Sequence, residues 1–255
     1  MNKTEMNENA KRVWKVLKTE PENYDTTSLY LKGGDGGFGK RRAGQYLSLR
    51  ILREDGWSEP HPFTLSCAPE DKILRLTIKK SGRFTSSIPD LKPGTPVKCA
   101  GPFGVFCKDI DKKGEILMIA GGVGITPFLS VLRHFRNTRA KNRVKLFWTN
   151  KTRDDAFAAD ELREMTKGLN LKIVHTLSRE KETDKYFQPD TPDVVYVPGY
   201  ATRELLGKHI HSPDTSSYLC GPPKMQDFVL GELEACGIDR RSVQIENFTY
   251  DSGKV

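Results

Sequence analysis

The hydrophobic pattern changes character near the middle of the chain. From about Lys11 to Gly101, apolar and polar residues alternate in short runs separated by Gly, Pro, Asp and Asn. This period of two predicts strands with one buried face. The runs are RVWKVLKT, TSLYLKG, QYLSLRIL, ILRLTIKK and TPVKCAG, and one short helix is expected near Ser86–Leu91. Several short strands at close intervals predict an antiparallel sandwich or barrel.

After Gly101 the apolar runs become short and continuous. EILMIAG, RVKLFWTN, NLKIVHTLS and SSYLCG have the composition of strands that are buried on both faces. Helix-like segments separate them, at Pro127–Arg139, Ala156–Lys167, Thr202–His209 and Pro223–Cys236. Alternating strands and helices predict a parallel sheet. The segment GPFGVFCKDIDKKG, rich in glycine and charge, resembles a linker between the two halves.

A glycine cluster follows the first strand of the second half, in the run EILMIAGGVGITP. Open parallel sheets bind ligands at the carboxyl ends of their strands. Gly121, Gly122 and Gly124 are expected to leave backbone N–H groups uncovered, Thr126 to cap the next helix, and Pro127 to fit its first turn. A phosphate or pyrophosphate is the expected ligand. Because Pro127 replaces the third glycine of the dinucleotide fingerprint, a plain tight strand–helix turn is an equal alternative.

Composition limits the other possibilities. The 255 residues suffice for one large domain or two ordinary ones. No run approaches the roughly 18 apolar residues of a membrane span, and the polar start lacks the apolar core of a secretory signal, so we expect a cytoplasmic protein. Five cysteines without C-x-x-C spacing argue against a disulfide framework, a zinc site or an iron–sulfur cluster. His209 and His211 lack a third ligand nearby and are interpreted as surface residues, so no metal site is predicted.

The net charge of +8 favours acidic partners. Phosphorylated cofactors, an acidic redox protein and nucleic acid all fit this charge. No helix-turn-helix, zinc-finger or aromatic–basic RNA-binding pattern is found, so nucleic acid is not a predicted partner.

Four further motifs join the glycine loop. They are HPFTLSCAPED, GRFTSSI, YLCGPPKM and IENF, in this order along the chain, with the glycine loop between the second and the third. Their order and spacing resemble the ferredoxin–NADP reductase superfamily over about Lys11–Phe248. The resemblance implies a Greek-key antiparallel β-barrel that binds flavin, at residues 8–104. An α/β domain with a parallel sheet, which binds NAD(P), is implied at residues 112–255.

The first motif, in the barrel, departs from the family pattern. By resemblance, Phe63 packs against the isoalloxazine ring and the Thr64 hydroxyl lies near flavin N5, with Pro62 beside them. His61 stands where the family usually has an arginine that contacts the FAD pyrophosphate, and histidine is only partly charged near neutral pH. We expect a nearby cation, Arg83 or Lys80, to compensate. Ordinary barrel core is the alternative interpretation of Phe63.

The second motif resembles the family's Gly-x-x-Ser/Thr phosphate loop and favours FAD over FMN. Glycine lets the backbone approach the pyrophosphate, and the threonine hydroxyl and nearby N–H groups are expected to donate to it. A simple turn is the alternative. The implied FAD contacts on this loop and on the strand before it are Thr77, Ile78, Lys79, Gly82, Arg83, Phe84 and Thr85.

The resemblance also implies the nicotinamide-nucleotide site. The glycine loop would hold the pyrophosphate, with Thr126 near the nicotinamide side. Cys220 would lie beside the nicotinamide, followed by Gly221 and Pro222, although a buried strand-end cysteine explains the same residue. Glu246 would assist proton balance or orient Cys220, and Phe248 would cover the flavin; a terminal strand is the alternative for both.

The choice of nucleotide rests on a Ser-Arg pair. Ser178 and Arg179 are similar to the family's 2′-phosphate site, and arginine suits phosphate geometry. This favours NADPH slightly, although relatives that use NADH also carry a Ser-Arg pair here.

Together, the resemblance implies an FAD-dependent NAD(P)H oxidoreductase. Hydride would pass from NAD(P)H to flavin N5, with Thr64, Cys220 and Glu246 as the catalytic residues. Electrons would then leave to a separate acceptor such as ferredoxin or flavodoxin. The alternatives are a reductase of free flavin, ferric chelates or quinone, an electron-transfer subunit of a multiprotein complex, and a non-catalytic nucleotide-binding module.

Overall fold

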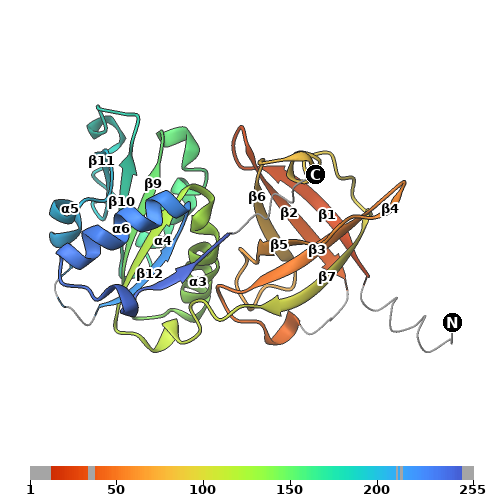
Figure 1. Cartoon of the computed structure of the whole chain (residues 1–255), viewed down its shortest axis with the longest axis horizontal. Helices are drawn as coiled ribbons and strands as arrows, with labels where there is room; N and C mark the ends of the chain where they lie inside the picture. The colour runs from red at the N-terminus through yellow and green to blue at the C-terminus, as the bar shows by residue number, and fades with distance from the viewer. Residues whose placement is uncertain (1–12, 34–37, 211, 213–214, 249–255) are drawn as a thin grey trace. The chain divides into compact units, whose positions relative to one another are not determined.

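The computed structural model describes residues 13–33, 38–210, 212 and 215–248. They form two compact units, drawn from Met1–Lys108 with Thr126–Thr138 and from Asp109–Ile125 with Arg139–Val255 (Figure 1). None of the helices in these residues has the length and apolar content that a membrane span requires. No group of three His, Cys, Asp or Glu side chains among the same residues is arranged to hold a metal ion. The domain ranges 8–104 and 112–255 stay a prediction, and residues 8–12 and 249–255 lie outside the described part.

The first unit contains an antiparallel sheet, as its alternating pattern predicts. The strand order is β4-β3-β7-β1-β2-β6, and β5 pairs with β3. A bridge between Leu65 and Leu76, with the Ser66 N–H donating to the Arg75 carbonyl at 2.9 Å, joins the end of β5 to β6 and closes the barrel. The strands are β1 (Val13–Pro21), β2 (Thr26–Gly33), β3 (Tyr46–Arg53), β4 (Gly56–Trp57), β5 (His61–Thr64), β6 (Leu74–Lys79) and β7 (Pro96–Phe103).

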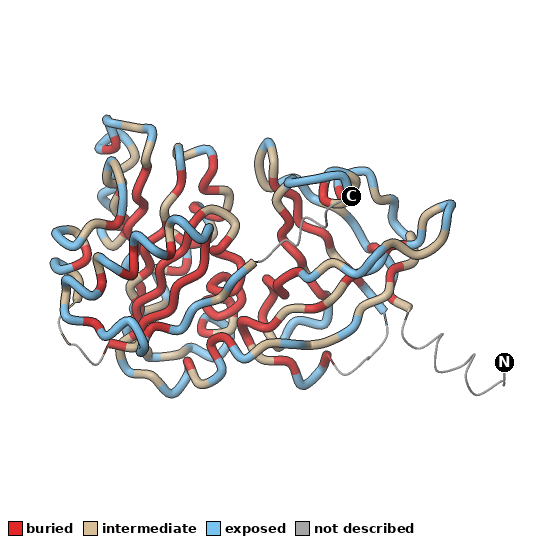
Figure 2. Tube along the Cα trace, in the orientation of Figure 1, coloured by how far each residue is buried: buried red, intermediate tan, exposed pale blue. Residues whose placement is uncertain are grey.

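The barrel core collects the inward residues of these strands. Along β6, Leu74, Leu76 and Ile78 are buried in the core, whereas Arg75 and Lys79 on the other face are half-buried. Figure 2 shows the buried residues of both units in red. The two-residue period of the sequence is therefore realised as an inside and an outside face.

The short helix of the barrel lies earlier than Ser86–Leu91, where the sequence predicts it. Helix α2 spans Arg83–Ser86. The Thr85 hydroxyl oxygen accepts hydrogen bonds from the N–H groups of Ser81 (2.8 Å) and Gly82 (3.0 Å), which fixes the start of the helix. Pro89 disfavours helical backbone at the residue before it, so the helix does not continue to Leu91.

Helix α3 (Thr126–Thr138) belongs to the first unit by its contacts, although it follows the first strand of the second unit in the chain. The Ser130 hydroxyl donates to the Cys67 carbonyl at 2.7 Å, and the Arg133 guanidinium donates to the Ser66 carbonyl. The His134 ring lies 2.5 Å from a carboxylate oxygen of Glu70. Polar contacts thus tie one face of the helix to the segment that follows β5.

The second unit contains the predicted parallel sheet. Its strand order is β11-β10-β9-β8-β12-β13. The strands are β8 (Glu115–Gly121), β9 (Arg143–Asn150), β10 (Leu171–Leu177), β11 (Val194–Pro198), β12 (Ser216–Cys220) and β13 (Gln244–Glu246). The predicted helices are confirmed as α4 (Ala159–Thr166), α5 (Arg203–Gly207) and α6 (Pro223–Ala235). Strand β11 was not predicted, because a five-residue edge strand that ends in proline carries a weak pattern.

Six short 3-10 helices complete the described structure. They are η1 (Phe38–Lys40), η2 (Ile110–Lys112), η3 (Gly122–Ile125), η4 (Arg153–Asp155), η5 (Asp184–Tyr186) and η6 (Arg240–Ser242).

The order of the parallel strands reverses beside β8. The chain first adds β9, β10 and β11 on one side of β8, and then adds β12 and β13 on the other. The carboxyl ends of β8 and β12 therefore form a topological switch point, which is where open α/β sheets bind ligands. Both loops that carry the predicted nucleotide motifs begin there.

Candidate functional site

The loops after β8 and β12 lie in direct contact, and glycines make that contact possible. A Cβ added at Gly124 would lie 2.3 Å from the carbonyl oxygen of Cys220, and one added at Gly121 would lie 2.2 Å from the sulfur of Met225. Gly221 makes the same contact from the other loop, since its added Cβ would lie 3.1 Å from the Gly121 nitrogen. Two of the three glycines that the sequence assigned to a ligand thus face the protein itself, and Gly124, which faces backbone atoms, is required for packing.

Gly122 is the exception in this loop. Its φ of +51° favours glycine, and an added Cβ would meet no atom within 4 Å. Its carbonyl oxygen accepts a hydrogen bond of 2.9 Å from the Trp148 indole, which fixes the turn. The open side of Gly122 is the place in the loop that a ligand can approach.

Helical backbone begins at Gly122, earlier than predicted. The turn η3 spans Gly122–Ile125 and runs into α3, so Thr126 is the first residue of α3 and not a cap ahead of it. Pro127 lies in the first turn of α3, as expected. Thr126 and Pro127 are both buried.

Cys220 and Glu246 are neighbours across the sheet, because the register of β12 and β13 pairs them directly. Cys220 is fully buried, with 0 % of its surface exposed. Burial, and secondarily the charge of Glu246, raises the pKa of the Cys220 thiol well above its ordinary 9.0. The thiol is therefore neutral near pH 7 and is not a nucleophile. Burial also raises the pKa of Glu246, so this carboxyl holds a proton more readily than an exposed one.

Sequence analysis missed a polar residue that touches the loop after β12 and the end of β13. Gln226 on α6 donates from its amide nitrogen to the Gly221 carbonyl at 2.8 Å and to the Glu246 carbonyl at 3.0 Å. The available signal was a polar residue at helical spacing from the buried Val229, Leu230 and Leu233.

The predicted 2′-phosphate pair lies after β10, next to the end of β9. The Ser178 N–H donates to the Asn150 carbonyl at 2.9 Å, and the Arg179 N–H donates to the Lys151 carbonyl at 2.8 Å. The Arg179 side chain is exposed. The backbone of the pair is thus fixed while its guanidinium faces solvent.

An acidic residue, Glu180, directly follows this pair. The Glu180 carboxylate accepts hydrogen bonds from the Tyr186 hydroxyl (2.7 Å) and the Arg153 N–H (2.5 Å). The Lys185 ammonium lies 3.9 Å away. The proposed 2′-phosphate site at Arg179 therefore has a negative charge, that of Glu180, next to it in the chain.

The structure brings the two barrel motifs together. The His61 ring on β5 stacks on the Phe84 ring of α2, with centroids 3.7 Å apart and planes at 25°. Phe63 lies 6.0 Å from the same ring and belongs to the barrel core, with 6 % of its surface exposed. This burial matches the alternative interpretation of Phe63. Thr64 is also buried, and Pro62 is exposed.

The cation beside His61 is Arg53, which sequence analysis also missed. Its guanidinium carbon lies 5.5 Å from the centre of the Phe84 ring, and the group donates to the Ser87 hydroxyl at 3.3 Å. Burial, and secondarily the charge of Arg53, lowers the pKa of His61. A neutral His61 therefore lies next to a permanent positive charge from β3.

The Thr85 hydroxyl is engaged by its own loop. Besides accepting the two N–H groups that start α2, it donates to the Gly82 carbonyl at 3.1 Å. This differs from the expectation that it donates to a phosphate. Gly82 has extended backbone and no atom within 4 Å of an added Cβ, so the loop is open on that side.

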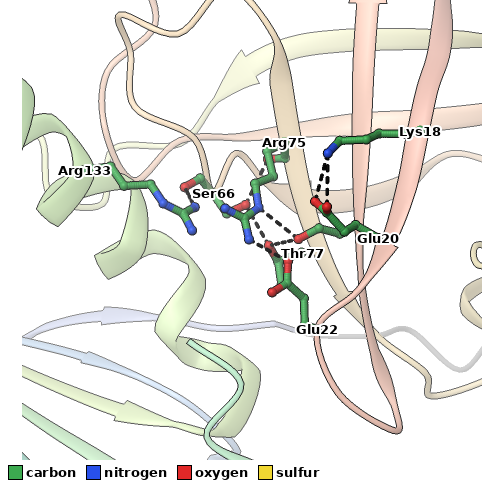
Figure 3. A network of polar contacts seen from close by, with 8 residues as sticks. Lys18, Glu20, Glu22, Ser66, Arg75, Thr77 and Arg133 are labelled. Carbon is green, nitrogen blue, oxygen red and sulfur yellow. Dashed lines mark hydrogen bonds and ion pairs between the residues drawn. The ribbon is translucent and has the colours of Figure 1, made fainter. Parts of the chain in front are cut away.

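The side chains of β6 that were predicted to contact FAD have partners within the protein. The Thr77 hydroxyl lies 2.9 Å from those of Ser28 and Ser66, within the polar network of Figure 3. Ile78 is buried in the barrel core, and Lys79 pairs with Asp25 at 2.9 Å. Contact between these residues and a flavin stays a prediction.

Comparisons with known proteins agree with this architecture. The model of the oxidoreductase NAD-binding domain family matches residues 118–230. The reductase component of propane 2-monooxygenase from Mycolicibacterium goodii is 30 % identical over 240 residues, which cover 92 % of this chain and 66 % of that protein. This chain therefore spans about two thirds of that relative's length.

Solved structures show the same fold at lower sequence identity. A ferredoxin NADP⁺ reductase from Neisseria gonorrhoeae, with bound FAD and NADP, gives a TM-score of 0.71 at 16 % identity and covers 92 % of this chain and 97 % of its own. A flavohemoglobin from Malassezia yamatoensis, with bound FAD and heme, gives 0.76 at 22 % identity over 92 % of this chain and 59 % of its own. The expected fold, an antiparallel barrel followed by a parallel-sheet domain, is confirmed.

Proposed function

We propose, on the premise that this chain belongs to the ferredoxin–NADP reductase superfamily, that it is an FAD-dependent NAD(P)H oxidoreductase serving a separate electron acceptor. The observation that carries the proposal is the switch point, where the open backbone at Gly122 lies on the same sheet edge as the Cys220–Glu246 pair. A bound FAD would supply the ring that takes a hydride at N5 from NAD(P)H and passes the electrons onward.

The carboxyl edge of the parallel sheet suits a dinucleotide. Arg179 follows β10, Gly122 follows β8, and Glu246 ends β13. Neighbouring strands are about 4.8 Å apart, so β10 and β13, separated by four steps, lie roughly 19 Å from each other. The 2′-phosphate, the pyrophosphate and the nicotinamide thus have separate candidate positions along one edge.

The barrel offers a set of groups that fit the anionic part of FAD. The guanidinium of Arg53 suits phosphate oxygens and keeps its charge at any physiological pH. The first N–H groups of α2 lie beside the open side of Gly82. We expect the Arg53 guanidinium to contact the FAD pyrophosphate, because His61 is neutral. Arg53 thereby replaces Arg83 or Lys80 as the expected compensating cation.

The proposed catalytic residues are a hydroxyl, a thiol and a carboxyl. Thr64 is expected near flavin N5, where a hydroxyl hydrogen bond helps to orient the ring. The Cys220 thiol stays protonated and contributes a small polarizable surface. Glu246, whose pKa is raised by burial, is suited to hold a proton near the reacting groups. Phe248, two residues further on, stays the predicted cover of the flavin.

We propose that NADPH is preferred slightly over NADH. The exposed Arg179 guanidinium supports this preference, and the Glu180 carboxylate weakens it. The Arg179→Ala variant is expected to lose NADPH activity about tenfold while NADH activity stays within twofold, because NADH lacks the 2′-phosphate.

Two acceptor classes are supported by specific observations. The net charge of +8 favours an acidic carrier such as ferredoxin or flavodoxin. The likeness to a propane 2-monooxygenase reductase component favours a second candidate, in which this chain is the reductase of a multicomponent enzyme. A reductase that uses free flavin as its substrate would lose its flavin during gel filtration, whereas the proposed enzyme retains it.

The deciding experiment is anaerobic flavin reduction with NADH and NADPH in parallel. The full chain, loaded with FAD, is mixed rapidly with each nucleotide while the absorbance of oxidised flavin is followed. Loss of that absorbance within seconds supports the proposal. A protein that retains FAD but is reduced by neither nucleotide would overturn it, and a protein that takes up no FAD would favour a non-catalytic nucleotide-binding module.

A further inference from the structure

We infer that Gln226 is a positioning residue that holds the C-terminal strand β13 against the loop after β12. The inference deepens the proposed function, because Cys220 and Glu246 are the groups that the proposed reaction uses in this unit. The structure assigns Gln226 this role through two hydrogen bonds from a single side-chain atom.

The geometry of Gln226 uses both of its donors. Its amide nitrogen carries two hydrogens, one directed to the Gly221 carbonyl (2.8 Å) and the other to the Glu246 carbonyl (3.0 Å). Gly221 directly follows Cys220, and Glu246 is the last residue of β13. One buried atom therefore joins the ends of two neighbouring strands at the candidate site.

Gln226 lies on the buried face of α6, where an apolar residue is expected. Together with Val229, Leu230 and Leu233 it forms the buried stripe of α6, and only 6 % of its own surface is exposed. A polar group buried at such a position destabilises the fold unless its hydrogen bonds are made. The two strand-end carbonyls supply these partners, which explains an amide in an otherwise apolar stripe.

Strand β13 needs support beyond its ladder. It has three residues, pairs with β12 over three register positions, and exposes Gln244 and Ile245. Short edge strands with few buried contacts open at low free-energy cost. Without the Gln226 amide, the buried Gly221 carbonyl and the half-buried Glu246 carbonyl would lose this donor, and the end of β13 would separate from the loop that follows Cys220.

The test compares Gln226→Met with Gln244→Met in the full FAD-loaded chain. Methionine keeps the length of glutamine but donates no hydrogen bond, and Gln244 is an exposed glutamine on β13 itself. Amide hydrogen exchange of residues 244–248 is expected to accelerate about tenfold in Gln226→Met and to stay unchanged in Gln244→Met. The rate constant of flavin reduction at saturating NAD(P)H is expected to fall about tenfold, while the nucleotide dissociation constant changes less than threefold.

A pH profile separates positioning from general damage. Burial raises the pKa of Glu246, so freeing β13 should move the pH dependence of flavin reduction toward lower pH as that carboxyl gains solvent. Gln244→Met should keep the wild-type profile. If Gln226→Met does not fold, Gln226→Leu, which also donates no hydrogen bond and matches the apolar stripe of α6, takes its place.

The outcomes distinguish this inference from the proposed function. Faster exchange together with slower reduction supports the role of Gln226. Unchanged exchange overturns it, and so does faster exchange with an unchanged reduction rate and pH profile, which would make Gln226 a structural link alone. If wild-type flavin is reduced by neither nucleotide, the proposed function fails, and the positioning of β13 by Gln226 is then decided by the exchange measurement alone.

Discussion

Replacing Gly124 by alanine tests whether the glycines after β8 serve packing within the protein. The new Cβ would lie 2.3 Å from the carbonyl oxygen of Cys220, 2.7 Å from its carbonyl carbon and 3.0 Å from the Cα of Gly221. All three neighbours are backbone atoms, and Cys220 is held in the sheet on both sides, by β8 and by β13. Close C···O contacts are about 3.3 Å, so the two loops would have to separate by about 1 Å.

The size of the effect follows from this overlap. Overpacking usually costs about 1–3 kcal/mol, and a collision between two backbone segments belongs at the upper end, so we expect a loss of about 3 kcal/mol in the free energy of unfolding. Gly122→Ala is the matched control: its φ is +51° but its Cβ would meet nothing within 4 Å. It should cost only about 1 kcal/mol, the strain of left-handed backbone. Gly82→Ala, extended and open, should change stability by less than about 0.5 kcal/mol.

The assay is urea unfolding of the protein without nucleotide. Hydrogen exchange of the peptides that contain β8 and β12 reports the second unit separately from the barrel. A Gly124→Ala protein as stable as Gly122→Ala would refute the packing argument for Gly124, and would favour a role for this glycine in admitting a ligand. In that case the variants would lose nucleotide binding while their stability without nucleotide stayed equal.

Three further predictions concern charge. Burial, and secondarily the charges of two nearby arginines, lowers the pKa of His175 from 6.5 to about 3, so the stabilisation present above pH 6.5 is lost as the pH falls toward 3. At pH 5 this lowers the free energy of unfolding by roughly 2 kcal/mol relative to pH 7. His175→Phe keeps a ring that can stack on Tyr196 but does not titrate, so its free energy of unfolding should lack this difference between pH 7 and pH 5. Arg53→Ala should raise the FAD dissociation constant about tenfold in a fluorescence titration, whereas the exposed Arg50→Ala on the same strand should change it less than twofold, and equal effects would contradict the assignment. Glu180→Gln should raise the NADPH-to-NADH ratio of kcat/KM about fivefold, because it removes a negative charge beside the proposed 2′-phosphate site, and an unchanged ratio would place the phosphate elsewhere.

Local patterns predicted most of the elements, and the misses have physical causes. The helices were placed to within three residues at each end, except for the end of α2, which was predicted at Leu91 but lies at Ser86, ahead of Pro89. His209, interpreted as a surface residue, is half-buried with its ring 5.3 Å from that of Phe147, while His211 lies outside the described residues. The burial of His209 depends on Phe147 of β9, more than sixty residues away in the chain. The residues next to His209 in the sequence carry no information about this contact.

The sequence alone determined the two kinds of sheet and the places of the loops. Alternation along ILRLTIKK and continuous burial along EILMIAG are properties of neighbouring residues, so the chain order suffices to read them. It also determined that glycines follow β8 and β12. What those glycines face was decided by the tertiary structure.

Packing between segments far apart in the chain made the remaining decisions. It placed Gly124 against the backbone of Cys220, Arg53 beside His61, and Gln226 between two strand ends. Each of these contacts depends on which strands become neighbours and on the room left between them. The physical reason is that a residue's chemistry is fixed by its type, whereas its partner, its burial and its pKa are fixed by whatever the fold brings against it.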